Sequence, residues 1–142
     1  MSPTDNKYAG RDLLDKWGVK PGMAIHVVGA GDPAIAGRLA ERAGRPLANP
    51  DEVYDLVVYW PADISEVTPT LAGLRGRIKP NGSIWVVVPK KGRVGLAGME
   101  WVRETAVIAA GLAAGLVDSK TAAVSPAETS YRFVIRLRDR PA

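Results

Sequence analysis

The chain has 142 residues, a length that fits one domain and is too short for two of ordinary size. It is 46% hydrophobic and 24% charged, and no apolar run approaches the roughly 20 residues that a bilayer-spanning helix needs. We therefore expect a soluble protein without a membrane partner. The chain has no cysteine and a single histidine, His26, which excludes a disulfide framework, a thiolate nucleophile and a zinc site.

Net charge and the N-terminus set further expectations. A net charge of +4 admits a polyanionic partner, but an excess of this size is common on solvated surfaces. The opening MSPTDNKYAGRD lacks the basic start and the apolar core of a secretion signal, so we expect a cytoplasmic protein. Residues 1–8 are small and polar and are predicted to form a flexible arm, followed by a single domain over residues 9–142.

The first third of the chain predicts a helix, a strand and a second helix. GRDLLDKWGVKPG has its apolar residues on one helical face before a Gly and Pro stop. MAIHVVG is nearly continuously apolar, which is typical of a buried parallel strand, and it ends at Gly29. Asp32 is placed as an N-cap with Pro33 at the first helical position. An apolar stripe follows on this helix, made of Ile35, Ala36, Leu39, Ala40 and Ala43.

The middle of the chain repeats the alternation of strand and helix. VYDLVVYW predicts a second buried strand from about Val53 to Trp60. A helix follows, because apolar residues recur at helical spacing at Val67, Leu71, Leu74 and Ile78. We expect a turn from Lys79 to Gly82. SIWVVVP then predicts a third buried strand, which Pro89 closes.

The C-terminal part predicts a long helix and a hairpin. The helix runs from about Trp101 to Ala114, and we expect its buried face to carry Trp101, Thr105, Ile108 and Leu112. LVDSKTAAVS and TSYRFVIRLR are predicted to pair as antiparallel strands. Alternation in the second strand places two sets of side chains on opposite faces. The core set is Tyr131, Phe133, Ile135 and Leu137, and the basic, solvated set includes Arg132, Arg136 and Arg138.

This order of elements predicts an α/β fold, a single Rossmann-like three-layer domain with a sheet of about five strands. YDLVVYW, RIKPNGSIWVVVPKK and the hairpin resemble the second half of the fold of S-adenosylmethionine-dependent methyltransferases. WGVKPG, SIWVVVPKK and AAGLVDSK resemble a family of short bacterial proteins without an assigned function. The resemblance implies a truncated methyltransferase-like sheet. Its first three strands lie side by side and parallel, and the last strand of the antiparallel hairpin inserts beside the third.

The turn GAGDPA has two interpretations. Gly29, Gly31 and Asp32 are candidate cofactor-binding residues, with S-adenosylmethionine the cofactor that the resemblance implies. However, only about 24 residues separate Gly31 from Asp55, where a complete methyltransferase fits two more strands and a helix. An acidic residue for ribose hydroxyls is therefore not evident. The structural interpretation is a tight turn that needs a positive φ at Gly31, with Asp32 capping the helix.

A second candidate site lies at the carboxyl ends of the strands. Tyr59, Trp60 and Asp63 follow the second strand and could line a cleft together with Lys90 and Lys91, because ligands of open parallel sheets bind at that edge. The alternative is that Trp60 lies in the core and that Asp63 caps a helix. For His26, inside an apolar strand, we expect a hydrogen-bonded core residue rather than a catalytic one.

Three classes of function remain open. The leading hypothesis is a non-catalytic module that binds a protein partner or a small ligand at the carboxyl edge of the sheet, as a monomer or small homo-oligomer. The alternative is an S-adenosylmethionine-dependent methyltransferase. A nucleic-acid binder would use Lys90, Lys91 and Arg93, but the basic residues lack the interleaved aromatic residues of a stacking platform, so we do not favour it.

Overall fold

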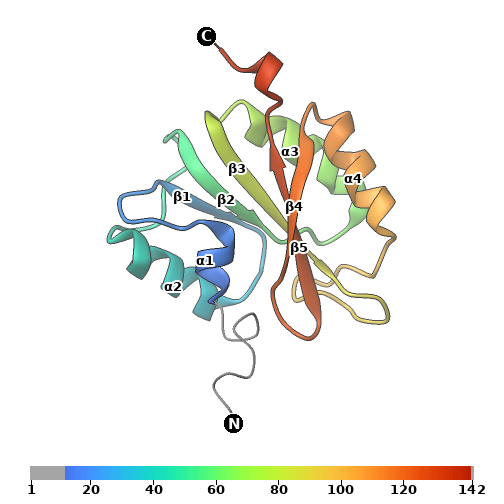
Figure 1. The fold of residues 1–142 in the computed structure, drawn as a ribbon. Coiled ribbons are helices and arrows are strands. Elements are labelled where there is room, and N and C mark those ends of the chain that lie inside the picture. Colours follow the sequence, from blue (N-terminus) through green and yellow to red (C-terminus); the bar gives the residue numbers. More distant parts are fainter. Residues whose placement is uncertain (1–11, 142) are drawn as a thin grey trace.

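The computed structural model describes residues 12–141, so the arm predicted at residues 1–8 lies outside the described part of the chain. Within residues 12–141, one five-stranded sheet carries helices on both faces (Figure 1). The helices of residues 12–141 lack the length and the apolar character of a membrane-spanning segment.

The helices and strands follow the predicted order, with short 3₁₀ helices at Ile64–Glu66 and Leu137–Asp139. The elements are α1 (Leu13–Trp17), β1 (Ile25–Val28), α2 (Pro33–Ala43), β2 (Tyr54–Tyr59), α3 (Val67–Arg75), β3 (Ile78–Pro89), α4 (Glu104–Ala113), β4 (Val117–Ala123) and β5 (Glu128–Val134).

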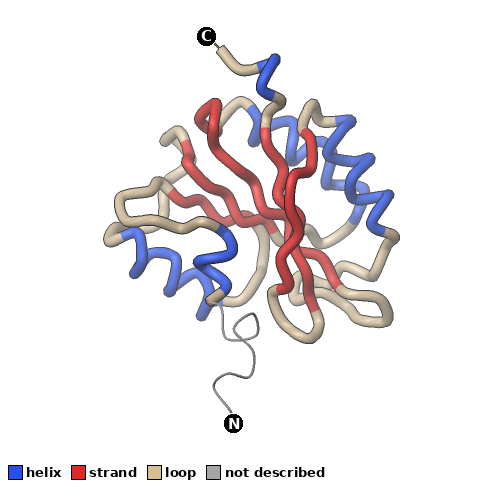
Figure 2. Tube along the Cα trace, viewed as in Figure 1, coloured by secondary structure: helices blue, strands red, loops and turns tan. Residues whose placement is uncertain are grey.

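The sheet has the order β1-β2-β3-β5-β4 (Figure 2). Strands β1, β2 and β3 are parallel, while β5 runs antiparallel to both β3 and β4. This order confirms that the first three strands lie side by side and that the last strand inserts beside the third. Because β5 is antiparallel, its first residue, Glu128, pairs with Pro89, the last residue of β3. The start of β5 therefore lies at the carboxyl edge of the parallel strands.

Two apolar cores hold the three layers together. In β2 successive side chains point to opposite faces, as the pleat of a strand requires. Leu56 and Val58 pack with Leu39 of α2 on the face that α1 and α2 cover. Val57 packs with Leu71 of α3 on the opposite face, which α3 and α4 cover. The three-layer arrangement predicted from the sequence is confirmed.

The segment from Lys79 to Gly82 forms a bulge inside β3 and not the predicted turn. The pairing with β2 jumps from Tyr54 opposite Ile78 to Leu56 opposite Ser83, so β3 carries the extra residues. A Cβ at Gly82 would lie 3.0 Å from the carbonyl oxygen of Lys79, so the bulge is tightly folded. Proline and glycine weaken a strand locally, but the apolar residues on either side keep both parts of β3 in the sheet.

The predicted buried face of the last helix is wrong. The helix begins at Glu104, and its buried residues are Val107 and Gly111, whereas Trp101 and Leu112 are 37% and 47% exposed. Helix α4 is apolar nearly all round, so the spacing of its apolar residues does not single out one face. Gly111 decides which face of α4 packs on the sheet, because a Cβ at this position would lie 2.1 Å from the ring of Phe133.

The predicted alternation of the last strand holds only as far as the strand extends. Tyr131, Phe133 and Ile135 are buried as expected, but Leu137 is 79% exposed. Strand β5 ends at Val134, and Leu137 begins a 3₁₀ helix, so the period of two no longer applies there. For the same reason, Arg136 and Arg138 do not share a strand face with Arg132, and the predicted basic face is not formed.

A short irregular segment covers the free edge of β1, where a complete methyltransferase sheet would continue. The amide of Ala48 donates to the carbonyl of Ile25 at 2.7 Å, and no strand lies between α2 and β2. His26 Nδ1 lies 3.3 Å from the carbonyl oxygen of Ala48, and its ring stacks on Tyr54 with centroids 4.5 Å apart. The segment thereby covers this edge of the sheet. His26 makes the predicted contact with a backbone carbonyl, but it is half-buried on the edge strand and is not the core residue that we predicted.

Candidate functional site

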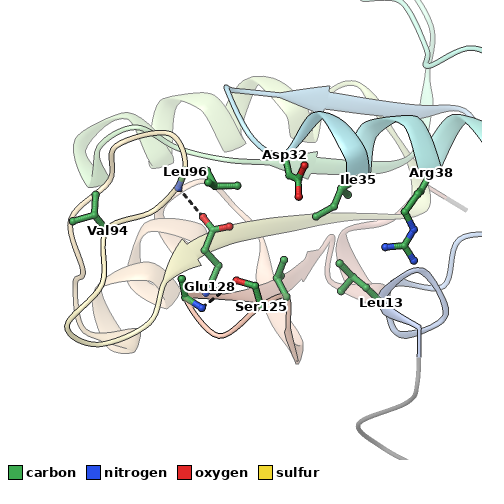
Figure 3. Close-up of a pocket in the computed structure, with 10 residues that line it drawn as sticks. Leu13, Asp32, Ile35, Arg38, Val94, Leu96, Ser125 and Glu128 are labelled. Carbon is green, nitrogen blue, oxygen red and sulfur yellow. Dashed lines mark hydrogen bonds between the residues drawn. The ribbon is translucent and has the colours of Figure 1, made fainter. Parts of the chain in front are cut away.

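A pocket of about 380 Å³ lies at the carboxyl edge of the sheet (Figure 3). This volume falls near the lower end of the roughly 300–1,000 Å³ typical of small-molecule sites. The walls come from α1, the start of α2, the loop after β3 and the turn between β4 and β5. The lining residues include Asp32, Ile35, Arg38, Leu96, Ser125 and Glu128.

Glu128 is the most buried charged group of the pocket, with 3% of its surface exposed. Its Oε2 accepts a hydrogen bond from the backbone N–H of Leu96 at 3.0 Å, and its own N–H donates to Ser125 Oγ at 3.1 Å. The other carboxylate oxygen points into the pocket (Figure 3). Among residues 12–141, Glu128 makes no ion pair. The carboxylate is thus held in one orientation and lacks a described counter-ion.

Asp32 contributes a second carboxylate to the pocket wall. Its Oδ1 accepts a hydrogen bond from the N–H of Ala34 at 2.9 Å, and Pro33 occupies the first helical position. This confirms the predicted N-cap, in which a short carboxylate satisfies a free N–H at the helix start. As with Glu128, no ion pair of Asp32 occurs within the described range.

Arg38 is the one basic residue among the described pocket residues, and its charge is already matched. It forms a salt bridge with Asp12, to which Arg42 also binds at 2.7 Å. Arg42 in turn reaches Asp15 at 2.5 Å, so these ion pairs tie α1 to α2. Burial acts to raise the pKa of Asp12, but the hydrogen bond and the charge of Arg38 outweigh it and lower that pKa. Asp12 therefore stays ionised and neutralises Arg38.

The glycine turn after β1 is shaped by Trp60. A Cβ at Gly29 would lie 2.1 Å from the carbonyl oxygen of Trp60, and a Cβ at Gly31 would lie 2.1 Å from its indole ring. Gly29 has φ +92°, whereas Gly31 is not among the glycines with positive φ, so the predicted positive φ at Gly31 is wrong. Both glycines make room for Trp60, which packs against the turn.

The sequence also matches a known family. Residues 14–136 match the model of a protein family whose description is "Protein of unknown function (DUF3052)". The chain belongs to this family. No curated protein matches the DUF3052 chain in sequence.

Several solved structures with a similar fold are methyltransferases. A SAM-dependent methyltransferase from Aquifex aeolicus is 15% identical with a TM-score of 0.66, covering 87% of this chain and 88% of that one. Magnesium protoporphyrin IX methyltransferase from Synechocystis PCC 6803 with bound SAH is 13% identical with a TM-score of 0.62. The match covers 87% of this chain and 78% of that one. Ribosomal protein L11 methylase from Lactobacillus delbrueckii subsp. bulgaricus is 12% identical with a TM-score of 0.59. The match covers 87% of this chain and 74% of that one. The DUF3052 chain therefore has a methyltransferase-like Rossmann fold.

The glycine turn does not fit a methyl-donor cofactor in the manner that this fold implies. Glycines in such turns allow the backbone to approach the ligand closely. In the DUF3052 chain, the indole of Trp60 fills the space beside Gly31 that a side chain would take. Irregular chain replaces the strand that would carry a ribose-binding acid beside β1. The glycines are explained by packing within the chain.

The remaining predicted site residues lie apart from the pocket. Tyr59 is fully buried and donates to Glu66 Oε2 at 2.7 Å; burial raises the pKa of its phenol, and the Glu66 carboxylate raises it further. Asp63 caps the 3₁₀ helix through Ser65, whose hydrogen bonds lower the pKa of Asp63. Lys91 lies 5.7 Å from the ring centroid of Trp101. Of the residues predicted for either candidate site, Asp32 alone lines this pocket; Tyr59, Trp60, Asp63, Lys90 and Lys91 do not.

Sequence reasoning missed Glu128, Leu96 and Ser125. A signal for Glu128 was present, because this acidic residue directly precedes TSYRFVIRLR, the strand predicted to run antiparallel beside the third strand. Such a position must fall at the carboxyl edge of the parallel strands. Leu96 carries no comparable signal, since it lies in an irregular loop and meets Glu128 only through the tertiary fold.

Two buried tryptophans provide a test of the packing around the turn. Trp60 is 1% exposed, and within the described part of the chain its buried Nε1 has no hydrogen-bond acceptor. Trp17 is 2% exposed, and its Nε1 donates to Ser130 Oγ at 3.1 Å. We expect Trp60→Phe to cost about 1 kcal/mol less than Trp17→Phe, because only the second variant loses a hydrogen bond. Urea denaturation of both variants measures this difference. Equal costs would show that the Trp60 N–H has an acceptor.

Proposed function

We propose that the chain is a non-catalytic binding module that takes a small ligand in the pocket at the carboxyl edge of its sheet. The observation that carries this proposal is the Glu128 carboxylate, which is 3% exposed and turns one oxygen into the pocket. Apolar side chains such as Ile35 and Leu96 supply most of the remaining walls. Ligand sites combine an apolar lining with a few placed polar groups in this way. A concave site of this size favours a small molecule over the face of a protein partner.

The polar groups of the pocket support binding rather than catalysis. Ser125 Oγ accepts hydrogen bonds from the backbone N–H groups of Ala127 and Glu128, both at 3.1 Å. Asp32 caps α2, and His26 does not line the pocket but stacks on Tyr54. A nucleophile needs a base within hydrogen-bond reach. Among the described pocket residues, no hydroxyl is hydrogen-bonded to such a base.

The alternative function is an S-adenosylmethionine-dependent methyltransferase. It is favoured by the fold, which matches 88% of a SAM-dependent methyltransferase from Aquifex aeolicus. Trp60 argues against it, because its indole packs against the glycine turn that would approach the cofactor. The two functions therefore differ in whether the methyl donor binds.

Calorimetric titration of the full chain separates the two functions. We expect no binding of S-adenosylmethionine, S-adenosylhomocysteine or common nucleotides. Micromolar binding of either of the first two compounds would contradict the proposal and favour the methyltransferase.

A fragment screen by NMR then tests the pocket itself. We expect small ligands to shift the amide signals of Leu96 and Glu128. The variant Leu96→Trp should weaken the binding of these ligands, because the larger side chain narrows the pocket. The matched control is Leu112→Trp, since Leu112 is a similarly exposed leucine on α4 outside the pocket. Ligands that shift only residues elsewhere, or that bind both variants equally, would contradict the proposed site.

A further inference from the structure

We propose that the ligand of this pocket is a small aliphatic amine, bound in its protonated form with its ammonium group on the Glu128 carboxylate. This inference rests on the proposed function and names the chemical class of the ligand. The nitrogen would donate to the Glu128 oxygen that points into the pocket, while the hydrocarbon part would lie against Leu13, Ile35 and Val124.

The charge of the pocket calls for a cationic ligand. Besides Glu128, two charged residues line the pocket, Asp32 and Arg38. Arg38 forms a salt bridge with Asp12, which lies outside the lining. Because Arg38 and Asp12 cancel, the Asp32 and Glu128 carboxylates remain without a counter-ion among the described residues. A buried carboxylate without a counter-ion is costly, so a ligand that brings a positive charge gains more here than a neutral one.

The chemistry of the walls favours an organic cation over a metal ion. Calcium takes six to eight oxygen ligands and magnesium requires near-octahedral coordination, largely from carboxylates, carbonyls and water. Residues 12–141 hold no group of three or more acidic, histidine or cysteine side chains that could bind a metal. Two carboxylates among apolar side chains suit a molecule that is charged at one end and apolar at the other.

The ammonium group must carry N–H donors. Quaternary ammonium groups are recognised by the faces of aromatic rings, and none of the described residues that line the pocket is aromatic. A carboxylate oxygen accepts strong, charge-assisted hydrogen bonds from an N–H donor. The free oxygen of Glu128 therefore selects a primary or secondary amine over a quaternary one.

The first test compares three probes of one size, n-butylamine, n-butanol and butyrate, at constant pH and ionic strength. The backbone amide of Leu96 is the reporter, because it donates to the same carboxylate at 3.0 Å. We expect n-butylamine to shift this signal saturably. We expect n-butanol to bind at least about 10-fold more weakly, because it cannot form the charged hydrogen bond. Butyrate should not bind, because its charge has the same sign as that of the Glu128 carboxylate. Equal binding of amine and alcohol would overturn the inference.

Variants assign the effect to Glu128. Glu128→Gln keeps an oxygen that can accept from Leu96 but removes the charge, and we expect it to weaken n-butylamine at least about 10-fold. Glu41→Gln, on an exposed position of α2, is the matched control and should bind as the native chain does. Should Glu128→Gln not fold, Asp32→Asn keeps a competent N-cap and should weaken the amine without affecting n-butanol.

The outcomes separate the two proposals. If n-butanol binds in the pocket and Glu128→Gln leaves n-butylamine unchanged, the ligand class is wrong while the proposed function stands. If none of the three probes binds and the fragment screen also fails to shift Leu96 and Glu128, the proposed function is contradicted as well.

Discussion

Gly31→Val is expected to lower the free energy of unfolding by about 3 kcal/mol, at the upper end of overpacking costs. A Cβ at this position would lie 2.1 Å from Cδ2 of Trp60 and 2.3 Å from Cε2, distances that the native packing cannot accommodate. The indole is 1% exposed, so it has no solvent-filled space into which to move. Urea denaturation followed by circular dichroism measures the change.

Two controls assign this cost to Trp60. Gly37→Val places the same side chain on an exposed position of α2 with no atom within 4 Å, and we expect a change within about 0.5 kcal/mol. In a Trp60→Ala background, Gly31→Val should cost less than about 1 kcal/mol, because the clashing ring is absent. A well-tolerated Gly31→Val in the native background would show that the turn is open, which would strengthen the methyltransferase alternative.

Gly111→Ala is expected to lower the free energy of unfolding by about 2 kcal/mol, although alanine is the better helix former. Gly111 is buried in α4, and a Cβ there would lie 2.1 Å from Cε1 of Phe133, which is itself fully buried. The added methyl would force α4 away from β5. Thermal and urea unfolding of the variant measure the loss.

The matched control has the opposite sign. Gly73 lies on an exposed position of α3 with no atom within 4 Å, so Gly73→Ala should raise the free energy of unfolding by about 0.5–1 kcal/mol. If both variants were stabilised, close packing of α4 on Phe133 would be contradicted and helix propensity alone would account for the data.

Local patterns in the sequence determined the order of helices and strands. The helix start at Asp32 and Pro33 was predictable, because an N-cap depends on residues that are neighbours in the chain. The apolar strands and the hairpin were predictable for a similar reason, since burial imposes its period on short segments. Together with the resemblance, these patterns also predicted the position of β5 beside β3, and the structure confirms that strand order.

Part of the candidate site could likewise be predicted, but with the wrong contacts. The sequence placed a site at the carboxyl edge of the sheet, where the pocket lies, and Asp32 belongs to its wall. It did not place Trp60 against Gly31 or select Val107 and Gly111 as the buried residues of α4. The spacing of apolar residues shows which face of a helix is buried only where the opposite face is polar, and α4 has no such polar face.

Only the tertiary structure decided which side chains form the pocket. Glu128 accepts a hydrogen bond from Leu96, 32 positions away in the chain, and it lines the same pocket as Asp32 because of the order of the sheet (Figure 3). Local propensity determines elements, because each depends on residues a few positions apart. A pocket depends on which distant segments pack together and on the few small residues, such as Gly31 and Gly111, that let them approach.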